Sequence, residues 1–382
     1  MSQQFGGVKL FYGIISLEME IEMKICFLAD ATSAHTKKWC EYFLNRGFEI
    51  IVISLTKGNI PECKVYNFDV GETIYESDRK KLFSYFGKIK RVKEIIKKEN
   101  PDIVHAHYAT SYGLLGALSN FKPYILSVWG SDVYDFPRRS FIHKCLLKYN
   151  LKKPSVIMST SSDMKAEIQK YTNRDVMVTY FGVDTAIYKP IPGFKNENEF
   201  TIGTVKSLFK VYGLDYLIRA FKVLVDNYRD EKFKLIIAGV GEEEENLKNL
   251  SKELGIDELV EFRGFLEIDK VVDTYNEMDV AVFPSLQESF GVSAVEAQSC
   301  GVPVVCSNVG GLPEATCPGK SSILVEPENV GELFEGLEKL YLDRDLRVEM
   351  GKNARKYVSD KFILEENFAK IESVYQSFKE EN

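Results

Sequence analysis

The stretch from Val280 to Pro303, VAVFPSLQESFGVSAVEAQSCGVP, limits the fold of this chain more than any other part of the sequence. A β-branched apolar run predicts a buried strand, a polar loop follows it, and a helical pattern comes after the loop. Gly301 is typical of a helix end, and Pro303 prevents the helix from continuing into the next apolar run. This order predicts a βαβ unit, whose loop opens at the carboxyl end of a strand, where parallel sheets bind ligands.

The same alternation of strand and helix patterns runs through most of the 382 residues, in two sets. A chain of this length is too long for one hydrophobic core, so the two sets predict an α/β protein with two parallel-sheet domains. Strands of the first set are expected at Lys24–Leu28, Glu49–Ser54, Ile103–Ala106, Tyr124–Val128, Val156–Ser159 and Val176–Tyr180. Those of the second set are expected at Phe200–Val205, Lys234–Gly239, Val260–Phe262, Val280–Pro284, Val304–Ser307 and Ile323–Val325.

Two carboxylates, Glu288 and Glu296, stand at the two ends of the central loop and helix. On one helix they would lie roughly 12 Å apart, farther than the roughly 5 Å of a retaining hydrolase pair. That spacing suits contacts with the two ends of one elongated ligand. Between them, the backbone N–H groups of Phe290 and Gly291 lie near a helix N-terminus, where a phosphate is favoured. For either glutamate alone, a solvated position on a surface helix is the more typical interpretation.

The string ESFGVSAVEAQSCGVPVV, followed by Gly310, Gly311 and Glu314, resembles the donor-site signature of glycosyltransferase family 4, the retaining enzymes of GT-B fold. The resemblance covers most of the chain from Met23 onward, and this region is its most specific part. It implies two Rossmann-like domains that face each other across a cleft. It also implies that the first glutamate, Glu288, faces a donor sugar, and that the second, Glu296, binds the ribose hydroxyls of a nucleotide. Ser289 precedes the amides of the phosphate site.

The segment Phe181-Gly182-Val183-Asp184 resembles the N-G-V-D segment between the domains of that family, with Phe181 in place of asparagine. The resemblance therefore implies a first, acceptor domain at residues 23–185 and a second, donor domain at residues 186–363. A last helix in residues 364–382, at about Leu364–Lys379, is expected to cross back onto the first domain. Residues 1–22 lack the order of a signal peptide, and we expect either a leader or a start at Met23.

Loops of the first domain are expected to face the cleft. In the loop from Asp30 to His35, small residues stand where the family often has two glycines, which argues against tight cradling of a phosphate or acceptor by this loop. Ser33 and His35 are its candidate residues for the acceptor side. Capping of the next helix by Ser33 or Thr32 is at least as typical of this pattern. Trp129-Gly130-Ser131-Asp132 resembles the family's H-G-S-D turn, with Trp129 in place of histidine. There we favour a turn role for Asp132, with acceptor support as the alternative.

The sequence His105-Ala106-His107 ends another expected strand. We expect the two side chains to point to opposite faces of the sheet, which makes them a poor metal site and one of them structural. His107 lies nearer the carboxyl end and matches the family position beside the donor sugar and the acceptor. The resemblance therefore makes His107, with Glu288, a candidate catalytic residue.

The stretch IGTVKSLFKVYG resembles the family's G-R-L-x-x-x-K-G segment, in which an Arg and a Lys neutralise a diphosphate. The matching positions here are Ser207 and Tyr212, so this chain departs from the pattern. Lys206 and Lys210 lie beside those positions and can replace the missing charges, because a diphosphate needs cations within reach. We favour Lys206 because it follows a strand, and a solvated lysine is the alternative.

A metal motif of the other glycosyltransferase fold, D-x-D, occurs at Asp343-Arg344-Asp345. It lies between two helical patterns near the C-terminus, and we interpret it as a helix cap. We therefore expect no metal requirement and no cofactor. The seven cysteines show no C-x-x-C spacing, which is typical of a reduced, cytoplasmic protein.

Charge is unevenly divided between the two parts. Residues 23–185 hold 25 Lys and Arg against 17 Asp and Glu, whereas residues 186–382 hold 23 against 36. Positive charge is concentrated in Arg79–Lys98, where aromatic residues alternate with lysines, as in helices on anionic lipid. The alternative is a solvated helix, because Ile89, Val92, Ile95 and Ile96 form a core stripe. Nucleic acid is not favoured, because no binding motif accompanies the patch and the whole chain is acidic.

Together these features predict a retaining hexosyltransferase that uses a nucleotide diphosphate sugar, UDP- or GDP-linked. The acceptor is expected to be a hydroxyl of a lipid-linked glycan in cell-surface polysaccharide or glycolipid biosynthesis. The enzyme is then cytoplasmic and peripheral on the inner face of the cell membrane. Two alternatives stay open: a nucleotide-sugar epimerase of GT-B fold, and a non-catalytic protein that binds nucleotide sugars.

Overall fold

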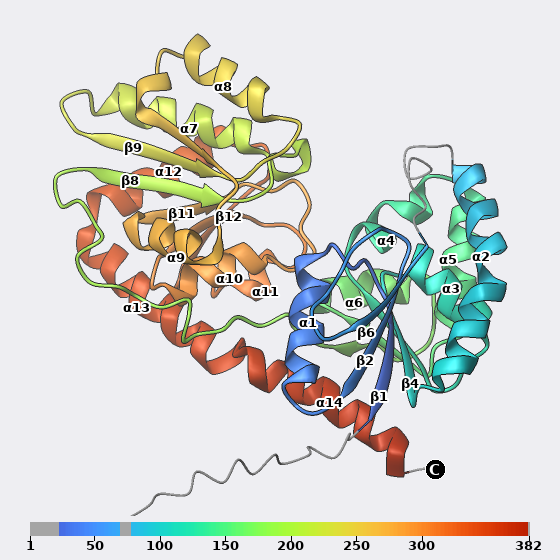
Figure 1. Cartoon of the computed structure of the whole chain (residues 1–382). Helices are drawn as coiled ribbons and strands as arrows, with labels where there is room; N and C mark the ends of the chain where they lie inside the picture. Colours follow the sequence, from blue (N-terminus) through green and yellow to red (C-terminus); the bar gives the residue numbers. More distant parts are fainter. Residues whose placement is uncertain (1–22, 69–77, 381–382) are drawn as a thin grey trace, which may run out of the picture.

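The computed structural model describes residues 23–68 and 78–380, although the side chains at 78–86 and at 380 lie outside the description. The predicted leader, 1–22, also lies outside it. The described chain forms two α/β units, each built on one parallel sheet with helices on both faces (Figure 1). The predicted fold class is confirmed. Within this part of the chain, no helix is both long and apolar enough to cross a membrane.

The first sheet has seven strands in the order β3-β2-β1-β4-β5-β6-β7. Its strands are β1 (Lys24–Leu28), β2 (Glu49–Ser54), β3 (Lys64–Asn67), β4 (Ile103–His107), β5 (Tyr124–Val128), β6 (Val156–Ser159) and β7 (Met177–Val178). All pairs are parallel, and in the centre Cys26 of β1 lies between Ile51 and Val104. The carboxyl ends of the strands therefore meet at one edge, as the βαβ pattern predicts.

The second sheet has six parallel strands in the order β10-β9-β8-β11-β12-β13. They are β8 (Phe200–Val205), β9 (Phe233–Ala238), β10 (Val260–Gly264), β11 (Val280–Phe283), β12 (Val304–Ser307) and β13 (Ser322–Val325). The strand β11 is buried along its whole length between β8 and β12. The loop after β11 therefore opens in the middle of the carboxyl edge.

Helices cover both faces of the first sheet. They are α1 (Ala34–Leu44), α2 (Asp78–Glu99), α3 (Ser111–Ser119), α4 (Ser131–Tyr134), α5 (Phe141–Lys152) and α6 (Ser162–Gln169), with a short helix η2 (Phe136–Arg138). On one face, Val92 of α2 and Leu147 of α5 pack with Leu126 of β5 in one apolar cluster. On the other face, Trp39 and Phe43 of α1 pack on Phe27.

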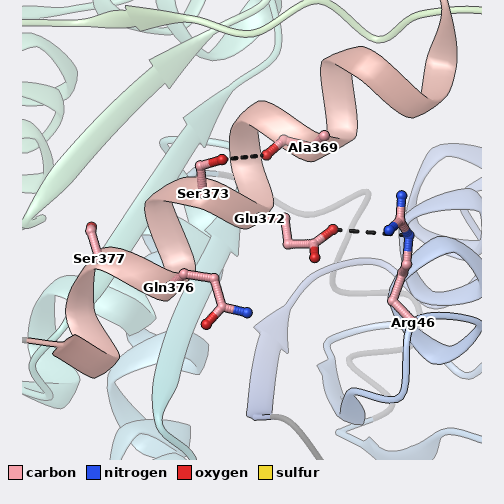
Figure 2. Close-up of a pocket in the computed structure, with 6 residues that line it drawn as sticks. All are labelled: Arg46, Ala369, Glu372, Ser373, Gln376 and Ser377. Atoms are coloured by element: carbon pink, nitrogen blue, oxygen red, sulfur yellow. Dashed lines mark hydrogen bonds and ion pairs between the residues drawn. The ribbon is translucent and has the colours of Figure 1, made fainter.

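The last helix, α14 (Leu364–Glu380), returns to the first unit, as predicted. Its residues Phe368 and Tyr375 are buried in the same cluster as Phe27. Arg46, just after α1, reaches toward Glu372 of α14 at 4.0 Å, across a groove at the surface (Figure 2). Apolar contacts therefore hold α14 in place.

The second sheet is covered by α7 (Leu214–Asn227), α8 (Glu244–Glu253), α9 (Ile268–Glu277), α10 (Val292–Ser299), α11 (Leu312–Ala315), α12 (Val330–Leu342) and α13 (Arg344–Lys361), with η3 (Lys210–Tyr212) and η4 (Asp257–Leu259). Asp343 is the N-cap of α13, and its carboxylate accepts from the Leu346 N–H at 2.8 Å. The interpretation of the D-x-D sequence as a helix cap is confirmed.

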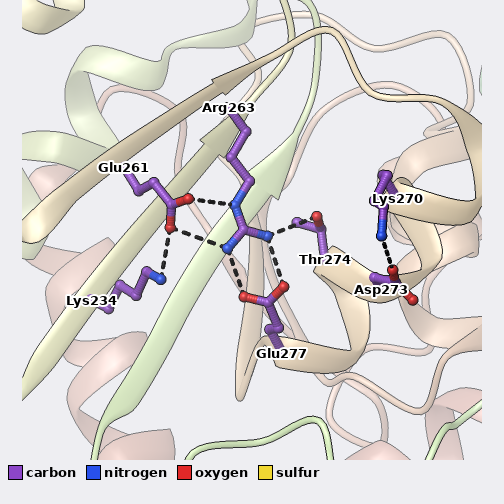
Figure 3. A network of polar contacts seen from close by, with 7 residues as sticks. All are labelled: Lys234, Glu261, Arg263, Lys270, Asp273, Thr274 and Glu277. Carbon is purple, nitrogen blue, oxygen red and sulfur yellow. Dashed lines mark hydrogen bonds and ion pairs between the residues drawn. The ribbon is translucent and has the colours of Figure 1, made fainter.

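A charged network fastens α9 to the edge strand β10 (Figure 3). The guanidinium of Arg263 donates to both oxygens of Glu277, at 2.9 and 2.6 Å, and to Glu261 at 3.0 Å. Lys234 of β9 pairs with Glu261 at 2.7 Å. Hydrogen bonds from Arg263 lower the pKa of Glu261 to about 2. The network therefore holds α9 against the sheet at its edge strand.

The chain crosses between the two units twice, and the two crossings lie side by side. The Val183 N–H donates to Phe362 O at 2.8 Å, and the Leu364 N–H donates to Val183 O at 3.1 Å. The segment predicted as the junction, 181–184, is therefore paired with the start of α14. Two backbone hydrogen bonds thus hold the two crossings together.

Candidate functional site

The carboxyl edges of the two sheets meet through a few polar contacts. The Ser161 hydroxyl, at the start of α6, donates to Ser289 O in the loop after β11 at 2.7 Å. Glu314 of α11 accepts from the Ser162 N–H at 2.6 Å, from the Ser162 hydroxyl at 2.7 Å and from the Tyr180 hydroxyl at 2.6 Å. Glu314 thus fastens the second unit to the first beside the central loop.

The centre of the site is an ion pair between Lys206 and Glu288. The Lys206 ammonium lies 2.6 Å from the Glu288 carboxylate, and the two side chains are only 12% and 10% exposed. The ammonium also lies 4.2 Å from the ring centre of Tyr212. Burial is the largest single influence on the pKa of Lys206 and lowers it, but the charge and hydrogen bond of Glu288, together with Tyr212 and Glu296, outweigh burial, so the pKa is raised and the ammonium stays charged.

Two glycines allow this pair to form. A Cβ on Gly239 would lie 2.0 Å from Lys206 O, and one on Gly310 would lie 1.8 Å from Glu288 O. Both glycines also have positive φ angles, of 137° and 51°. The backbone after β9 and the Gly310-Gly311 turn can therefore pass directly against the two loops that carry the pair.

Lys210, the second predicted cation, does not join this pair. It lies exposed in η3 and lines a hollow between α7 and α8, together with Asp215 and Glu243. The turn of η3 is held to the central loop, because Leu286 N–H donates to Val211 O at 2.8 Å. Of the two lysines, the structure brings Lys206 to the glutamate.

The loop ends at the N-terminus of α10, as predicted. Phe290 is buried, with its ring stacked on Tyr180 at 5.4 Å and edge-to-face with Phe362 at 5.3 Å, so only its backbone is left to contact a ligand. Gly291 is the N-cap of α10, with φ +104°. The first N–H groups of a helix have no partner within it, so this turn is suited to an anion.

Glu296 extends from α10 near two tyrosines and two lysines. Burial raises the pKa of Glu296, while the charges of Lys38 and Lys206 and hydrogen bonding by Tyr188 and Tyr275 act in the opposite direction. Lys38 belongs to α1 of the first unit and Lys206 to the second, so charges from both units act on the Glu296 carboxylate. Lys206 acts on both glutamates, which places all three groups in one charged region.

The prediction that His105 and His107 point to opposite faces is wrong. Their rings lie 4.8 Å apart, because residues two positions apart on a strand share a face. His105 contacts the Tyr375 hydroxyl at 2.6 Å and the Ser127 hydroxyl at 2.8 Å. It is the structural member of the pair, in agreement with the expectation that one histidine is structural.

His107 lies below the surface of the cleft. It is 1% exposed, with Trp39 on one side and Trp129 on the other, each with a ring centre at 4.6 Å. Neither ring nitrogen has a hydrogen-bond partner among the described residues. Burial lowers the pKa of His107 well below its usual range. In this conformation His107 supports Trp129, which covers it.

Trp129, His35 and Phe181 form an aromatic patch on the first unit. His35 stacks on Phe181 with ring centres 4.6 Å apart, and Trp129 lies 5.8 Å from His35 and 5.6 Å from Phe181. Burial and the charges of Lys38 and Lys206 lower the pKa of His35 to about 4. Two of the positions that depart from the family, 129 and 181, are therefore neighbours in space.

The remaining predicted residues have local roles. Ser33 is the N-cap residue of α1, but neither it nor Thr32 caps the helix through its side chain. Thr32 donates instead to Asp30, from its N–H at 2.8 Å and from its hydroxyl at 2.7 Å, so the capping interpretation is wrong. The Asp132 carboxylate is buried and accepts from the Ala109 N–H at 2.6 Å and the Gly130 N–H at 2.7 Å. This agrees with its turn role.

Comparison with known proteins places both units in one family. The model for glycosyl transferases group 1 matches residues 189–357, and the model for glycosyl transferase 4-like proteins matches residues 24–161. An uncharacterized glycosyltransferase of Methanocaldococcus jannaschii is 30% identical over 292 residues, which cover 75% of this chain and 79% of that protein.

The capsular polysaccharide biosynthesis glycosyltransferase CapM of Staphylococcus aureus is 26% identical over 363 residues, which cover 90% of this chain and 93% of that protein. Among solved structures, HepE of Anabaena in complex with UDP and glucose matches with a TM-score of 0.75 and 19% identity, over 93% of this chain and 100% of that one. This chain therefore belongs to the group 1 glycosyltransferases, and it has their GT-B fold.

Proposed function

We propose that the chain transfers a hexose from a nucleotide diphosphate sugar to a hydroxyl of a glycan acceptor, with retention at the anomeric carbon. The observation that carries the proposal is the buried pair of Lys206 and Glu288 beside the N-terminus of α10. A structural neighbour, HepE, has been determined with UDP and glucose, which supports a nucleotide-linked donor.

In this proposal the donor diphosphate replaces Glu288 as the partner of Lys206. A diphosphate carries more negative charge than a carboxylate, and it can also accept hydrogen bonds from the amides of Phe290 and Gly291. Ser289 completes the loop, and Lys210 serves as an outer cation. The groups stabilise the charge that develops on the leaving diphosphate, which is electrostatic catalysis without a metal ion or a cofactor.

Glu288, released from Lys206, then accepts hydrogen bonds from hydroxyls of the donor sugar. Glu296 binds the ribose hydroxyls through its carboxylate. Because the diphosphate leaves from the face that the acceptor approaches, the configuration at the anomeric carbon is kept. Closure about the paired crossings at Val183 and Leu364 excludes water, so that transfer is faster than hydrolysis.

On the first domain, we propose that Trp129, His35 and the turn around Ser33 line the acceptor side. His107 acts through Trp129, since it lies beneath that ring and is 1% exposed. Asp132 holds the turn that carries Trp129, because it accepts from the Gly130 N–H. These residues set the position of the acceptor hydroxyl relative to Glu288.

The acceptor is proposed to be lipid-linked, in polysaccharide or glycolipid biosynthesis, which agrees with the similarity to CapM. Helix α2 supports a cytoplasmic enzyme that is peripheral on an anionic membrane. Its described part exposes five cations, whereas Val92, Ile95 and Ile96 are buried in the core. The exposed cations are Lys90, Arg91, Lys93, Lys97 and Lys98. The aromatic residues of its first turns lie outside the described side chains.

A donor screen tests the proposal. The chain is incubated with labelled UDP- and GDP-hexoses, with and without a lipid extract as the acceptor source, and with EDTA. Transfer to the lipid fraction with one donor, unchanged by EDTA, is the expected result. Interconversion of the nucleotide sugar without an acceptor would instead identify an epimerase, and binding without any turnover would identify a non-catalytic binding protein.

A further inference from the structure

We infer that α5 is a membrane-docking element, which binds an anionic lipid bilayer through its first turn and its lysines. The observation is an exposed apolar pair in a basic segment. Phe141 is 79% exposed, the highest value among the large apolar side chains that the structure describes, and the adjacent Ile142 is 66% exposed. The inference rests on the proposed lipid-linked acceptor, and it adds an apolar membrane contact to the exposed cations of α2.

The sequence around the pair is strongly one-sided in charge. From Arg138 to Lys153 the chain has six Lys and Arg residues and no Asp or Glu. Single apolar residues at a surface are common, but two large ones side by side, followed by cations on the same helix, are typical of interfacial segments. Arg138 is paired with Glu167 at 3.3 Å, so the later lysines are the main source of charge.

Helix α5 has one buried face and one exposed face. Leu147, Asn150 and Leu151 are buried against the domain, and the Asn150 amide donates to Ala109 O at 2.8 Å. The opposite face is exposed at Phe141, Lys144, Cys145, Lys148, Tyr149 and Lys152, at spacings of three and four residues. The exposed face is thus apolar in the first turn, at Phe141 and Ile142, and basic along the rest of the helix. Such a face fits a bilayer, with Phe141 and Ile142 among the acyl chains and the lysines at the headgroups.

Helix α5 lies on the same face of the first domain as the exposed cations of α2. Figure 1 shows α5 beside α2 and α3 on the side of the first domain that faces away from the second domain. The apolar cluster that joins Leu147 to Val92 confirms that α5 and α2 cover the same face of the sheet. The exposed cations of α2 therefore extend the basic surface, and α5 supplies the apolar contact that the described part of α2 buries in the core.

The first turn of α5 lies toward the cleft edge. The strand β5 ends there at Val128, the aromatic patch begins at Trp129, and α4 and η2 lead from it to Phe141. The ring of His143 packs on Phe136 of η2 at 4.7 Å, which ties the start of α5 to this edge. Docking through Phe141 therefore brings the acceptor side of the cleft close to the bilayer, where a lipid-linked glycan would be presented.

The test is flotation of the full chain with vesicles of phosphatidylcholine containing phosphatidylglycerol, compared with phosphatidylcholine alone. We expect binding to the anionic vesicles only, and weaker binding at high salt. Phe141→Ser with Ile142→Ser should lower the affinity about tenfold or more. Lys144→Ala with Lys148→Ala should lower it about 25-fold, at about fivefold for each cation. Lys352→Ala with Lys356→Ala, which removes two exposed cations from α13, is the matched control and should not change it.

A direct probe is Phe141→Trp, whose emission should shift to the blue on anionic vesicles and be quenched by brominated lipid. All variants should bind UDP like the native chain, so a failure here is distinct from a failure of the proposed donor site. A native chain that ignores anionic vesicles at low salt would overturn the inference. So would the serine variants floating normally, or changing only the oligomeric state, which would assign the pair to a contact between copies of the chain.

Discussion

Replacing Lys206 by methionine is the most informative single change, because Lys206 is the cation closest to the proposed diphosphate site. Its ammonium lies 2.6 Å from Glu288, and both side chains are about nine-tenths buried. A hydrogen bond to a charged group contributes about 1.5–3 kcal/mol. Lys206→Met should therefore weaken UDP binding by roughly 12- to 150-fold. Uridine, which lacks the diphosphate, should bind the variant and the native chain equally well.

The assay is isothermal titration calorimetry with UDP and with uridine, on the native chain and on two variants. Lys210→Met is the matched control, because Lys210 is exposed and does not join the ion pair. It should change the UDP affinity by a small factor at most. If Lys206→Met bound UDP as tightly as the native chain, or if Lys210→Met caused the larger loss, the assignment of the diphosphate to Lys206 would be refuted.

The same change has a separate effect on stability. Removing one partner of a buried ion pair leaves the other charge uncompensated, at a cost of about 3 kcal/mol. The double variant Lys206→Met with Glu288→Gln should recover most of that loss, because the buried charge is gone as well. Thermal unfolding of the four proteins in this cycle measures the coupling. Additive losses from the two changes would contradict a direct interaction.

Three further predictions follow from neighbouring residues. Burial raises the pKa of Glu296, so the folded chain binds more protons than the unfolded chain between the usual and the raised pKa, and stability falls as the pH rises through that window. Glu296→Gln should thus raise the melting temperature at neutral pH while it weakens binding of the free nucleotide about 10-fold. Equal nucleotide affinity by calorimetry would contradict the ribose assignment. Trp129→His restores the family residue and should raise the KM for the acceptor while leaving the UDP affinity within about twofold; a changed donor KM with an unchanged acceptor KM would place Trp129 on the donor side. Glu314→Ala removes three hydrogen bonds between the domains, two of them to Ser162, so small-angle scattering should show a larger radius for the variant, and an unchanged radius would mean that Glu314 does not hold the domains together.

Local patterns in the sequence were sufficient for most of the fold. Strands such as Glu49–Ser54 have the predicted bounds, and the helix Val292–Ser299 ends just before Gly301 as predicted, because apolar periodicity and a terminating glycine act within a few residues. The strand β3 (Lys64–Asn67) was not predicted. It lies at a sheet edge and is only partly buried, so it has no apolar pattern to reveal it.

The candidate site was predictable where it depends on a motif and not where it depends on tertiary contacts. The choice of Lys206 agrees with the observed ion pair, since a lysine directly after a strand must lie at the carboxyl edge. The contact of Glu314 with Ser162 joins residues 152 positions apart, and no local signal reports it. The burial of His107 likewise depends on Trp39 and Trp129, which come from two other elements.

Two of the departures from the family motifs, at Trp129 and Phe181, share one signal in the sequence. An aromatic residue replaces a polar one at both Trp129 and Phe181, and the fold brings the two rings within 5.6 Å. Each change alone is compatible with a turn or a linker. Only the position of the junction beside the first sheet shows that they form one surface with His35.

The central claim is transfer of a hexose from a nucleotide sugar at the Lys206–Glu288 pair, with retention. The most direct test is proton NMR of the glycosidic linkage in the product that the native chain makes from an α-linked nucleotide hexose, with Lys206→Met as the comparison. The account predicts an α-linked product from the native chain and little product from the variant. A β-linked product, or equal product from Lys206→Met, would contradict it.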